Sequence, residues 1–380
     1  MRLVGSVLRE GWEVRKLNEI ANIRTGKWNA NHSIDNGEFR FYTCAYNYLQ
    51  CNTKRFSGEC LILPGNGVNV GEVFYYNGDF DAYQRTYVLS EIKIIAKYLH
   101  FHMTYFWKEL GTKKQYGSAT NFIKIGNFED YDVSFPPLQE QEKIVAILDE
   151  AFSAIDKAKA NAELNLQNAK ELFESYLQSV FENRGEGWEE NKLNDVCKIT
   201  SKLIDPKQEE FQNLIHIGAG NIESEKGTLI GLKTAKEENL ISGKFLFDET
   251  MVLYSKIRPY LMKVVRCNFK GLCSADIYPL VPIKDKITQD FLYHLLLSSH
   301  FTEYAMEGSQ RAGMPKVNRK HLFEYTFYCP PFQEQKTIVK RLDTLSKQTK
   351  ALEKIYQEKL RDLDELKKSI LQKAFSGELT

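Results

Sequence analysis

Two loops rich in hydrogen-bond donors hold the side chains best suited to binding a polyanion. One runs from Lys113 to Lys124 and the other from Gly308 to Lys320, and both combine small residues with basic and amide side chains. Arg, Asn and Gln can form paired hydrogen bonds with nucleic-acid base edges, whereas Lys, Ser and Thr suit phosphates. Both loops are therefore candidate nucleic-acid contacts, and an ordinary solvated loop is the alternative interpretation.

The candidates divide by chemistry. The base readers proposed from side-chain type are Gln115, Asn121, Gln310 and Arg311. The proposed phosphate contacts are Lys113, Lys114, Lys124, Lys316, Arg319 and Lys320, and the same loops add Ser118, Thr120 and Asn318. A second basic turn, residues 256–260, adds Lys256 and Arg258, and the predicted loops after two Trp-containing motifs add Arg24, Lys27 and Lys202.

An internal repeat positions these loops. Glu10-Gly11-Trp12-Glu13 recurs at 186–189, and the six residues from Pro136 to Gln141 recur at 330–335, with a shift of 194. Beyond the second motif the shift stays constant, so the length difference of 18 residues lies between the two motifs. The chain is two copies of one unit, in which the part after Pro-Pro has a fixed length and the part before it varies.

Each Pro-Pro pair opens a predicted long helix, where proline costs little because the first N–H groups of a helix are unpaired. Apolar residues then alternate spacings of four and three over more than four heptads, which is typical of a coiled coil. The predicted seam is Ile144, Leu148, Ile155, Asn165 and Leu172, with Leu342, Leu352, Lys359, Leu363 and Leu366. Its polar members, Asn165 and Lys359, are expected to fix the register.

Charge favours pairing of the two helices with each other. Residues 139–182 carry a net charge of −5, and residues 333–376 carry a net charge of +4. A generic helical dimerisation arm is the alternative on the pattern alone.

The segments before the helices predict two α+β globules of about 120–140 residues each. Short β-type runs at 60–63, 86–89, 251–254 and 263–265 are followed by helical stretches at 97–109 and 288–301. The expected boundaries are 1–135 and 185–329 for the globules, and 136–184 and 330–380 for the helices.

Composition limits the remaining possibilities. The chain has 380 residues, too many for one core, and its formal net charge is +1, so binding to nucleic acid would require local positive patches. The seven cysteines form no C-x-x-C pair, which favours reduced, buried thiols over disulfides or zinc. No apolar run approaches about 20 residues, so we expect a cytoplasmic protein.

Because these motifs occur in this order and are repeated, the chain resembles the specificity subunits of Type I restriction–modification enzymes. The resemblance rests on the Pro-Pro-x-Gln-Glu-Gln motifs at 136–141 and 330–335, the two Gly-Trp-Glu motifs and the C-terminal run 371–379. It covers essentially the whole chain.

The resemblance implies two target-recognition domains that read a bipartite, asymmetric site in double-stranded DNA. It implies that the helices pair as an antiparallel coiled coil with pseudo-two-fold symmetry, and that they act as a spacer. It further implies docking of two methyltransferase subunits, and through them of restriction subunits, in a prokaryotic cytoplasm. S-adenosylmethionine, ATP and Mg are then expected in the partner subunits, with no cofactor, metal or catalytic residue in this chain.

Two other functions compete with this one. A fused methyltransferase–nuclease fragment would need Asp or Asn before Pro-Pro, where the chain has Phe135 and Cys329. The Gly-rich run Ile217–Asn221 lacks the spacing of a nucleotide loop, and no G-x-x-x-x-G-K-[ST] motif is present. The other competitor is a coiled-coil scaffold that never contacts DNA, which salt-sensitive, sequence-selective DNA binding would exclude.

Overall fold

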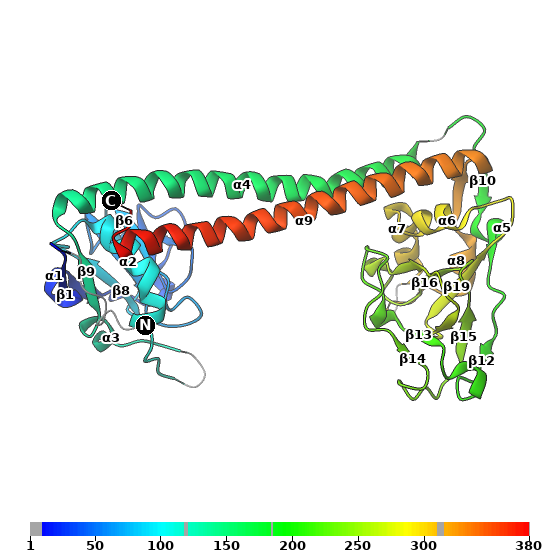
Figure 1. Cartoon of the computed structure of the whole chain (residues 1–380), viewed down its shortest axis with the longest axis horizontal. Helices are drawn as coiled ribbons and strands as arrows, with labels where there is room; N and C mark the ends of the chain where they lie inside the picture. Colours follow the sequence, from blue (N-terminus) through cyan, green and yellow to red (C-terminus); the bar gives the residue numbers. More distant parts are fainter. Residues whose placement is uncertain (1–9, 118–120, 184, 310–314, 380) are drawn as a thin grey trace. The chain divides into compact units, whose positions relative to one another are not determined.

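The computed structural model describes residues 10–117, 121–183, 185–309 and 315–379. The chain forms two compact units, Met1–Glu163 with Glu358–Thr380, and Leu164–Gln357. Each unit contains one globule and parts of both long helices, α4 and α9 (Figure 1). The boundaries expected from the sequence differ from these units, because they place each long helix in a separate segment, 136–184 and 330–380.

The first globule contains two sheets and a strand pair. Strands β2-β8-β5-β6 form an antiparallel sheet, β4-β3-β7 form a second sheet, and β1 pairs with β9. The strands are β1 (Glu13–Lys16), β2 (Asn22–Thr25), β3 (Phe39–Tyr42), β4 (Leu49–Cys51), β5 (Glu59–Pro64), β6 (Phe74–Asn77), β7 (Phe80–Ala82), β8 (Thr86–Ser90) and β9 (Asp132–Phe135). The helices are α1 (Leu17–Ile20), η1 (Ala30–His32), α2 (Ala96–Phe106), η2 (Trp107–Gly111) and α3 (Ile125–Glu129).

The second globule repeats this plan. Strands β11-β19-β16-β17 form an antiparallel sheet, β12-β15-β18-β13-β14 form a second sheet, and β10 pairs with β20. The strands are β10 (Glu189–Lys192), β11 (Cys197–Lys198), β12 (Leu203–Ile204), β13 (Ile215–Ile217), β14 (Lys233–Thr234), β15 (Lys244–Phe247), β16 (Val252–Ser255), β17 (Val264–Arg266), β18 (Gly271–Cys273), β19 (Ile277–Pro282) and β20 (Thr326–Cys329). The helices are α5 (Leu193–Val196), η3 (Glu209–Phe211), η4 (Ala219–Asn221), η5 (Pro259–Leu261), α6 (Gln289–Leu296), α7 (Ser299–Glu307) and α8 (Arg319–Glu324).

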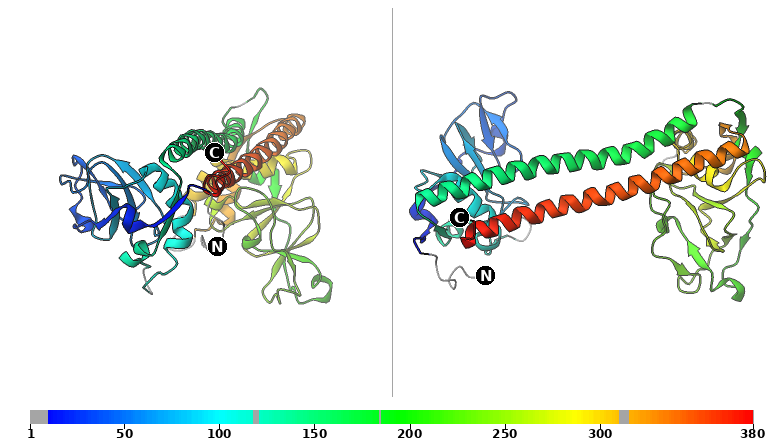
Figure 2. Two further views of the ribbon diagram at one scale, coloured as in Figure 1. Left: turned by 60° about the vertical axis from the view of Figure 1, so that its left-hand side comes forward. Right: turned by 45° about the horizontal axis from the view of Figure 1, so that its top comes forward.

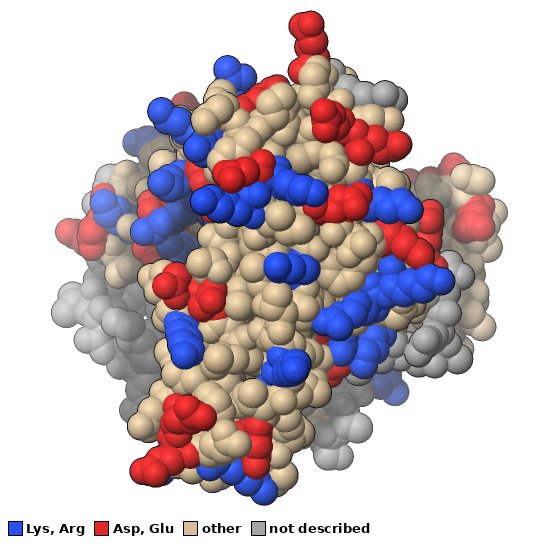
Figure 3. Space-filling model, turned by 90° about the vertical axis from the view of Figure 1, so that its right-hand side faces the viewer, with Lys and Arg blue, Asp and Glu red and all other residues tan. Residues whose placement is uncertain are grey.

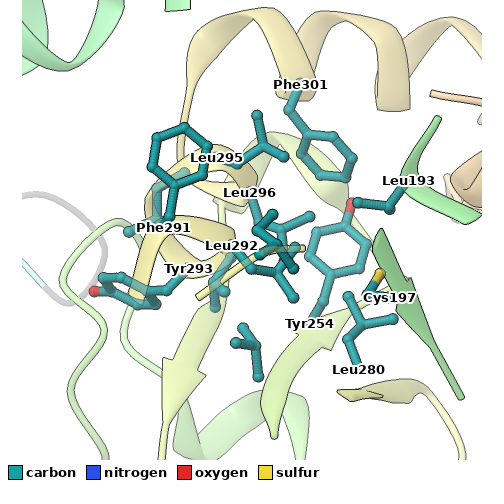
Figure 4. Close-up of a cluster of buried hydrophobic side chains, with 14 of the residues drawn as sticks. Leu193, Cys197, Tyr254, Leu280, Phe291, Leu292, Tyr293, Leu295, Leu296 and Phe301 are labelled. Atoms are coloured by element: carbon teal, nitrogen blue, oxygen red, sulfur yellow. The ribbon is translucent and has the colours of Figure 1, made fainter. Parts of the chain in front are cut away.

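A central strand in each globule is buried on both faces, which explains its unbroken apolar run. In β5, Leu61 and Leu63 pack into the core that contains α2, whereas Cys60 and Ile62 pack into a separate cluster around Phe80. Successive strand residues point to opposite faces, so one strand serves both clusters. The second globule has the same arrangement, and Figure 4 shows its larger cluster, where Tyr254 of β16 meets the side chains of α6 and α7.

Helices α4 (Leu138–Glu182) and α9 (Phe332–Ser376) each have 45 residues, and their ends correspond under the shift of 194. At 1.5 Å per residue each extends over about 67 Å. Within the first unit they run antiparallel, because Lys159 pairs with Asp364 while Asp156 pairs with Lys367 at 3.5 Å (Figure 2).

The heptad pattern is present, but half of its positions lie one residue later than predicted. The predicted seam residues Ile144, Leu148, Ile155, Leu342 and Leu363 are buried or half-buried. The prediction was wrong for five exposed residues, namely Asn165, Leu172, Leu352, Lys359 and Leu366. Their half-buried successors are Leu166, Phe173, Glu353, Leu360 and Lys367.

Side-chain type explains the difference at three of the five positions, since Leu166 and Leu360 are apolar where Asn165 and Lys359 are polar, and Phe173 is larger than Leu172. It does not explain why Leu352 and Leu366 are exposed beside half-buried Glu353 and Lys367. Leu172 and Phe173 are both apolar, so the pattern fits either phase, and the larger Phe173 takes the buried place against the second globule's core. Phe152 likewise lies in the first globule's core. Asn165 and Lys359 are therefore outside the packed face and have no register-fixing role.

Other expectations are met by the described residues. The β-type runs correspond to β5, β8, β16 and β17, and the helical stretches to α2 and to α6 with α7. All seven cysteines are free, and only Cys44 is not fully buried. Within the described ranges no helix combines the length and apolarity needed to cross a membrane.

Candidate nucleic-acid interface

The first predicted loop is exposed at every candidate position that the structure describes. Lys113, Lys114, Gln115, Asn121 and Lys124 are all exposed. The Lys124 ammonium lies 4.2 Å from the centre of the Tyr116 ring, a cation–π contact between the two ends of the loop. Ser118 and Thr120 lie outside the described residues.

Backbone hydrogen bonds join this loop to the turn that follows β5. Gly67 N–H donates to the Asn121 carbonyl at 2.9 Å, and Ile123 N–H donates to the Gly65 carbonyl at 2.9 Å. The loop is thereby anchored to a central strand of the sheet. The turn at 65–67 therefore joins the candidate interface, and the sequence analysis did not identify it.

A third segment, Tyr83–Thr86, joins the same cluster. Gly65 N–H donates to the Arg85 carbonyl at 2.9 Å, and Gly26 N–H donates to the Thr86 carbonyl at 3.3 Å. Both glycines are required by close approach, since a Cβ at Gly26 would lie 1.7 Å from the Ala82 carbonyl oxygen and one at Gly65 2.2 Å from that of Arg85. This segment was also missed, although the two glycines, each just beyond a strand, were the available signal.

The second globule holds its loop in the same way. Arg258 N–H donates to the Pro315 carbonyl at 2.9 Å, and Val317 N–H donates to the Lys256 carbonyl at 2.8 Å. The shift of 194 takes Asn121 to Pro315 and Ile123 to Val317, so both loops use the same bonds. Lys256 N–H also donates to the Asp276 carbonyl at 3.0 Å, as Gly65 N–H does to that of Arg85.

Several predicted contacts of the second globule lie on its surface. The exposed members are Lys202, Arg258, Lys316, Asn318, Arg319 and Lys320. Lys316 forms an ion pair with Asp276 at 3.1 Å, and Arg258 holds its place in the turn with a left-handed backbone, φ 50°. Gln310 and Arg311 lie outside the described residues.

Three predicted contacts have a structural setting that the sequence analysis did not anticipate. The Lys256 side chain is only 13% exposed, its ammonium donates to the Ala275 carbonyl, and burial lowers its pKa, so it is not available to a phosphate. The Asn318 side chain caps α8 by accepting the His321 N–H at 2.9 Å. Arg24 lies in strand β2 instead of a loop, and its guanidinium nitrogen Nη2 is 3.8 Å from the Glu91 carboxylate oxygen Oε1.

Basic and acidic side chains are mixed on one face of the second globule. On the face in Figure 3, basic and acidic side chains are interspersed around an uncharged area. The net charge of +1 agrees with such mixing. The loop clusters are defined by their backbone hydrogen bonds and their donor side chains.

The described residues offer little to a metal or nucleotide. They contain no group of three His, Cys, Asp or Glu side chains that could hold a metal ion. The run Ile217–Asn221 forms the end of β13 and the short turn η4, where Asn221 accepts the Gly218 N–H at 2.8 Å. This turn is closed by its own asparagine and opens no long helix of the kind that binds phosphates.

Comparison by sequence gives a consistent result. The profile described as "Type I restriction modification DNA specificity domain" matches twice, over residues 9–166 and 185–361. The Type I restriction enzyme EcoDI specificity subunit of Escherichia coli is 33% identical, covering 97% of this chain and 89% of its own. The MjaVIII specificity subunit of Methanocaldococcus jannaschii is 23% identical, covering 84% and 79% respectively.

Solved structures share the fold. A chain from a structure of a type I R-M system has a TM-score of 0.74 at 17% identity, covering 98% of this chain and 100% of that one. The HsdS subunit of Thermoanaerobacter tengcongensis has a TM-score of 0.59 at 17% identity, covering 100% of both chains.

Proposed function

The chain belongs to the Type I restriction–modification DNA specificity family, and we propose that each of its two recognition domains binds one half of a bipartite, asymmetric DNA site. The observation that carries this proposal is the scaffold found in both globules. The same backbone bonds hold the loop that ends at Ile123 and the loop that ends at Val317. The side chains carried by the two scaffolds differ, so the two domains are expected to bind different half-sites.

A backbone scaffold shared by the two domains, with side chains that differ between them, suits DNA recognition. Exposed lysines such as Lys113, Lys114 and Lys320 would contact phosphates and position each domain without reading sequence. The DNA sequence would be read by side-chain amide and guanidinium groups on the loop of each domain and on the turns that are hydrogen-bonded to it. This reading does not need a strongly basic chain, because only the clusters must be positive.

We further propose that the helix pair docks two methyltransferase subunits and, through them, restriction subunits. A groove of about 590 Å³ in the second unit is lined by Leu172 and Tyr176 of α4 and by Thr344 and Leu345 of α9. Leu366, the repeat equivalent of Leu172, is exposed in the first unit. The groove offers an apolar surface to one partner, and Leu366 marks the related position in the first unit.

In this proposal the chain adapts other subunits to a sequence and performs no catalysis. Methyl transfer with S-adenosylmethionine, and translocation with ATP and Mg, belong to the partner subunits, and the complex works in the cytoplasm of a prokaryote. Base flipping, which a methyltransferase needs to reach its target, would also be a partner activity.

Radiolabelled methyl transfer tests this division of labour. DNA is incubated with S-adenosylmethionine and the chain alone, the methyltransferase subunits alone, or both together. We expect specific methylation only with both, and salt-sensitive DNA binding by the assembled complex. Methyl transfer by the chain alone would instead identify an enzyme, and equal methylation without the chain would leave a scaffold as the better account.

A further inference from the structure

We propose that the first recognition domain reads bases mainly through Asn29, Gln84 and Arg85, three residues outside the donor-rich loop. The inference rests on the proposed function, because it assumes that this domain binds DNA. It names which side chains give the first half-site its sequence.

Gln84 and Arg85 occupy the tip of a tightly held turn. The Tyr83 carbonyl accepts the Thr86 N–H at 2.8 Å, which leaves Gln84 and Arg85 as the two central residues, and both are exposed. Gln84 N–H donates to the Trp28 carbonyl at 2.9 Å, and the Arg85 carbonyl accepts the Gly65 N–H. The backbone is fixed on both sides, so the two side chains start from a defined position.

Asn29 and Gln84 form an exposed amide pair. Gln84 Nε2 donates to Asn29 Oδ1 at 2.9 Å, and both residues are exposed. This bond leaves the side-chain oxygen of Gln84, Oε1, free to accept and the side-chain nitrogen of Asn29, Nδ2, free to donate. An acceptor beside a donor is what the major-groove edge of adenine requires, since it offers the N6 donor and the N7 acceptor.

The neighbouring residue Trp28 makes this corner rigid. Its indole N–H donates to the buried Asp81 carboxylate at 3.0 Å, and Asp81 also accepts the Thr53 hydroxyl at 2.7 Å. The Trp28 ring stacks on His32 with a centroid distance of 4.0 Å and an angle of 4°. Trp28 is still 41% exposed, so it offers apolar surface beside the amide pair.

Arg85 adds a forked donor on the same turn. An exposed guanidinium can bind O6 and N7 of guanine together. The second domain differs at this point, because the equivalent of Arg85 is Asp276, which accepts Lys316 at 3.1 Å and lies 3.6 Å from Lys256. A cationic turn tip is therefore a feature of the first domain, and the two half-sites should differ accordingly.

The methylation motif tests the assignment. The complete complex with its methyltransferase subunits is prepared with Asn29→Ala plus Gln84→Ala, or with Arg85→Ala, and the methylated sites are mapped by single-molecule sequencing. We expect discrimination to fall on the order of 10- to 100-fold at an A·T pair and at a G·C pair, respectively, of one half-site only. The other half-site and the spacer should not change.

Two further variants make the outcome specific. Gln84→Glu keeps the acceptor that faces the base but removes the Nε2 donor that holds Asn29, so it should relax selection at the A·T pair and leave the G·C pair read by Arg85 unchanged. The matched control replaces Gln50 and Arg55 with Ala, two exposed residues of the same domain that are not part of the turn Tyr83–Thr86, and should keep the wild-type motif.

The possible failures are distinguishable. If the turn variants keep the wild-type motif while Gln115→Ala or Asn121→Ala relaxes it, the proposal is overturned but the protein still reads DNA. If the wild-type complex methylates without a bipartite motif, the proposed function itself fails.

Discussion

One glutamine in each repeated motif fastens a long helix to its globule. Gln141 accepts the Ile95 N–H at 3.0 Å and donates to the Pro136 carbonyl at 2.8 Å. Gln335 accepts the Thr288 N–H at 2.8 Å and donates to the Pro330 carbonyl at 3.0 Å. Both side chains are buried, so the recurrence of Pro-Pro-x-Gln-Glu-Gln has a structural cause.

Replacing Gln335 with Leu should therefore destabilise the chain. Gln335 Nε2 also donates to the Lys286 carbonyl at 2.8 Å, so the Thr288 N–H and the Lys286 and Pro330 carbonyls lose a partner. Unpaired polar groups of this kind cost roughly 2–4 kcal/mol together. Urea unfolding measures the difference. The control is Gln333→Leu, an exposed glutamine two residues earlier, which should change stability by less than about 0.5 kcal/mol. Equal effects of the two substitutions would contradict the clamp.

A buried histidine, His102, and a half-buried one, His100, should make the first unit sensitive to acid. Burial lowers the pKa of His100 from 6.5 to about 4 and that of His102 to about 3. The unfolded chain therefore takes up protons that the folded chain excludes. Stability present above pH 6.5 is lost as the pH falls toward 4, by at most about 1.4 kcal/mol per pH unit for each histidine.

Denaturant unfolding at several pH values between 7.5 and 5 measures this loss. In His102→Gln one of the two contributions is absent, so the free energy of unfolding should fall less steeply than in the wild type. Carboxylates titrate in both proteins and cancel in the comparison. Identical slopes would show that His102 does not contribute.

The sequence could name the donor-rich loops and the turn at 256–260 that supports the second loop, but not the turns that support the first loop. The turn Tyr83-Gln84-Arg85-Thr86 contains no Gly, Pro or Asn, so turn chemistry gave no signal. Its importance comes from Gly26 and Gly65, which are distant in sequence and are brought to it by the sheet. The burial of Lys256 was equally hidden, because it depends on Ala275 and Tyr278.

At the scale of elements, the repeat predicted both long helices with nearly correct ends, yet five of the ten predicted seam residues are exposed. A heptad read from one sequence has two possible phases wherever neighbouring residues are both apolar, as at Leu172 and Phe173. The globule cores decide between them. Leu172 is thereby left on the surface, where it lines the groove of the second unit.

Lengthening both helices tests their proposed role as a spacer. Inserting one heptad into α4 and one into α9 at equivalent positions keeps the packing phase, since seven residues are about two turns. The unread spacer of the methylated site should lengthen, while both half-sites stay the same. An insertion in α4 alone is the control and should impair assembly. An unchanged spacer in the double insertion would contradict the role.

At the scale of the whole molecule, the end of the chain completes the globule at its beginning. Leu371 and Ala374 of α9 are buried in the core of the first unit, and Phe375 packs against Tyr98 and His102. The first unit is therefore discontinuous in sequence, which the repeat alone did not reveal.

A chain that ends at Ser369 should consequently lose stability in its first unit. Removing Leu371, Ala374 and Phe375 exposes apolar surface, at a cost of about 3–5 kcal/mol. Limited proteolysis should then cleave the region 10–135 faster. The full-length control with Gln372→Ala and Lys373→Ala, two exposed residues, should resist like the wild type. Unaltered protection of the shortened chain would refute the discontinuous unit.

The most direct test of the central claim is the methylation motif that the wild-type chain imposes on its methyltransferase partners, mapped by single-molecule sequencing. Two domains with the same scaffold and different side chains predict two short, unequal half-sites separated by an unread spacer of constant length. A continuous motif, a palindrome, or a motif that persists without this chain would contradict the account.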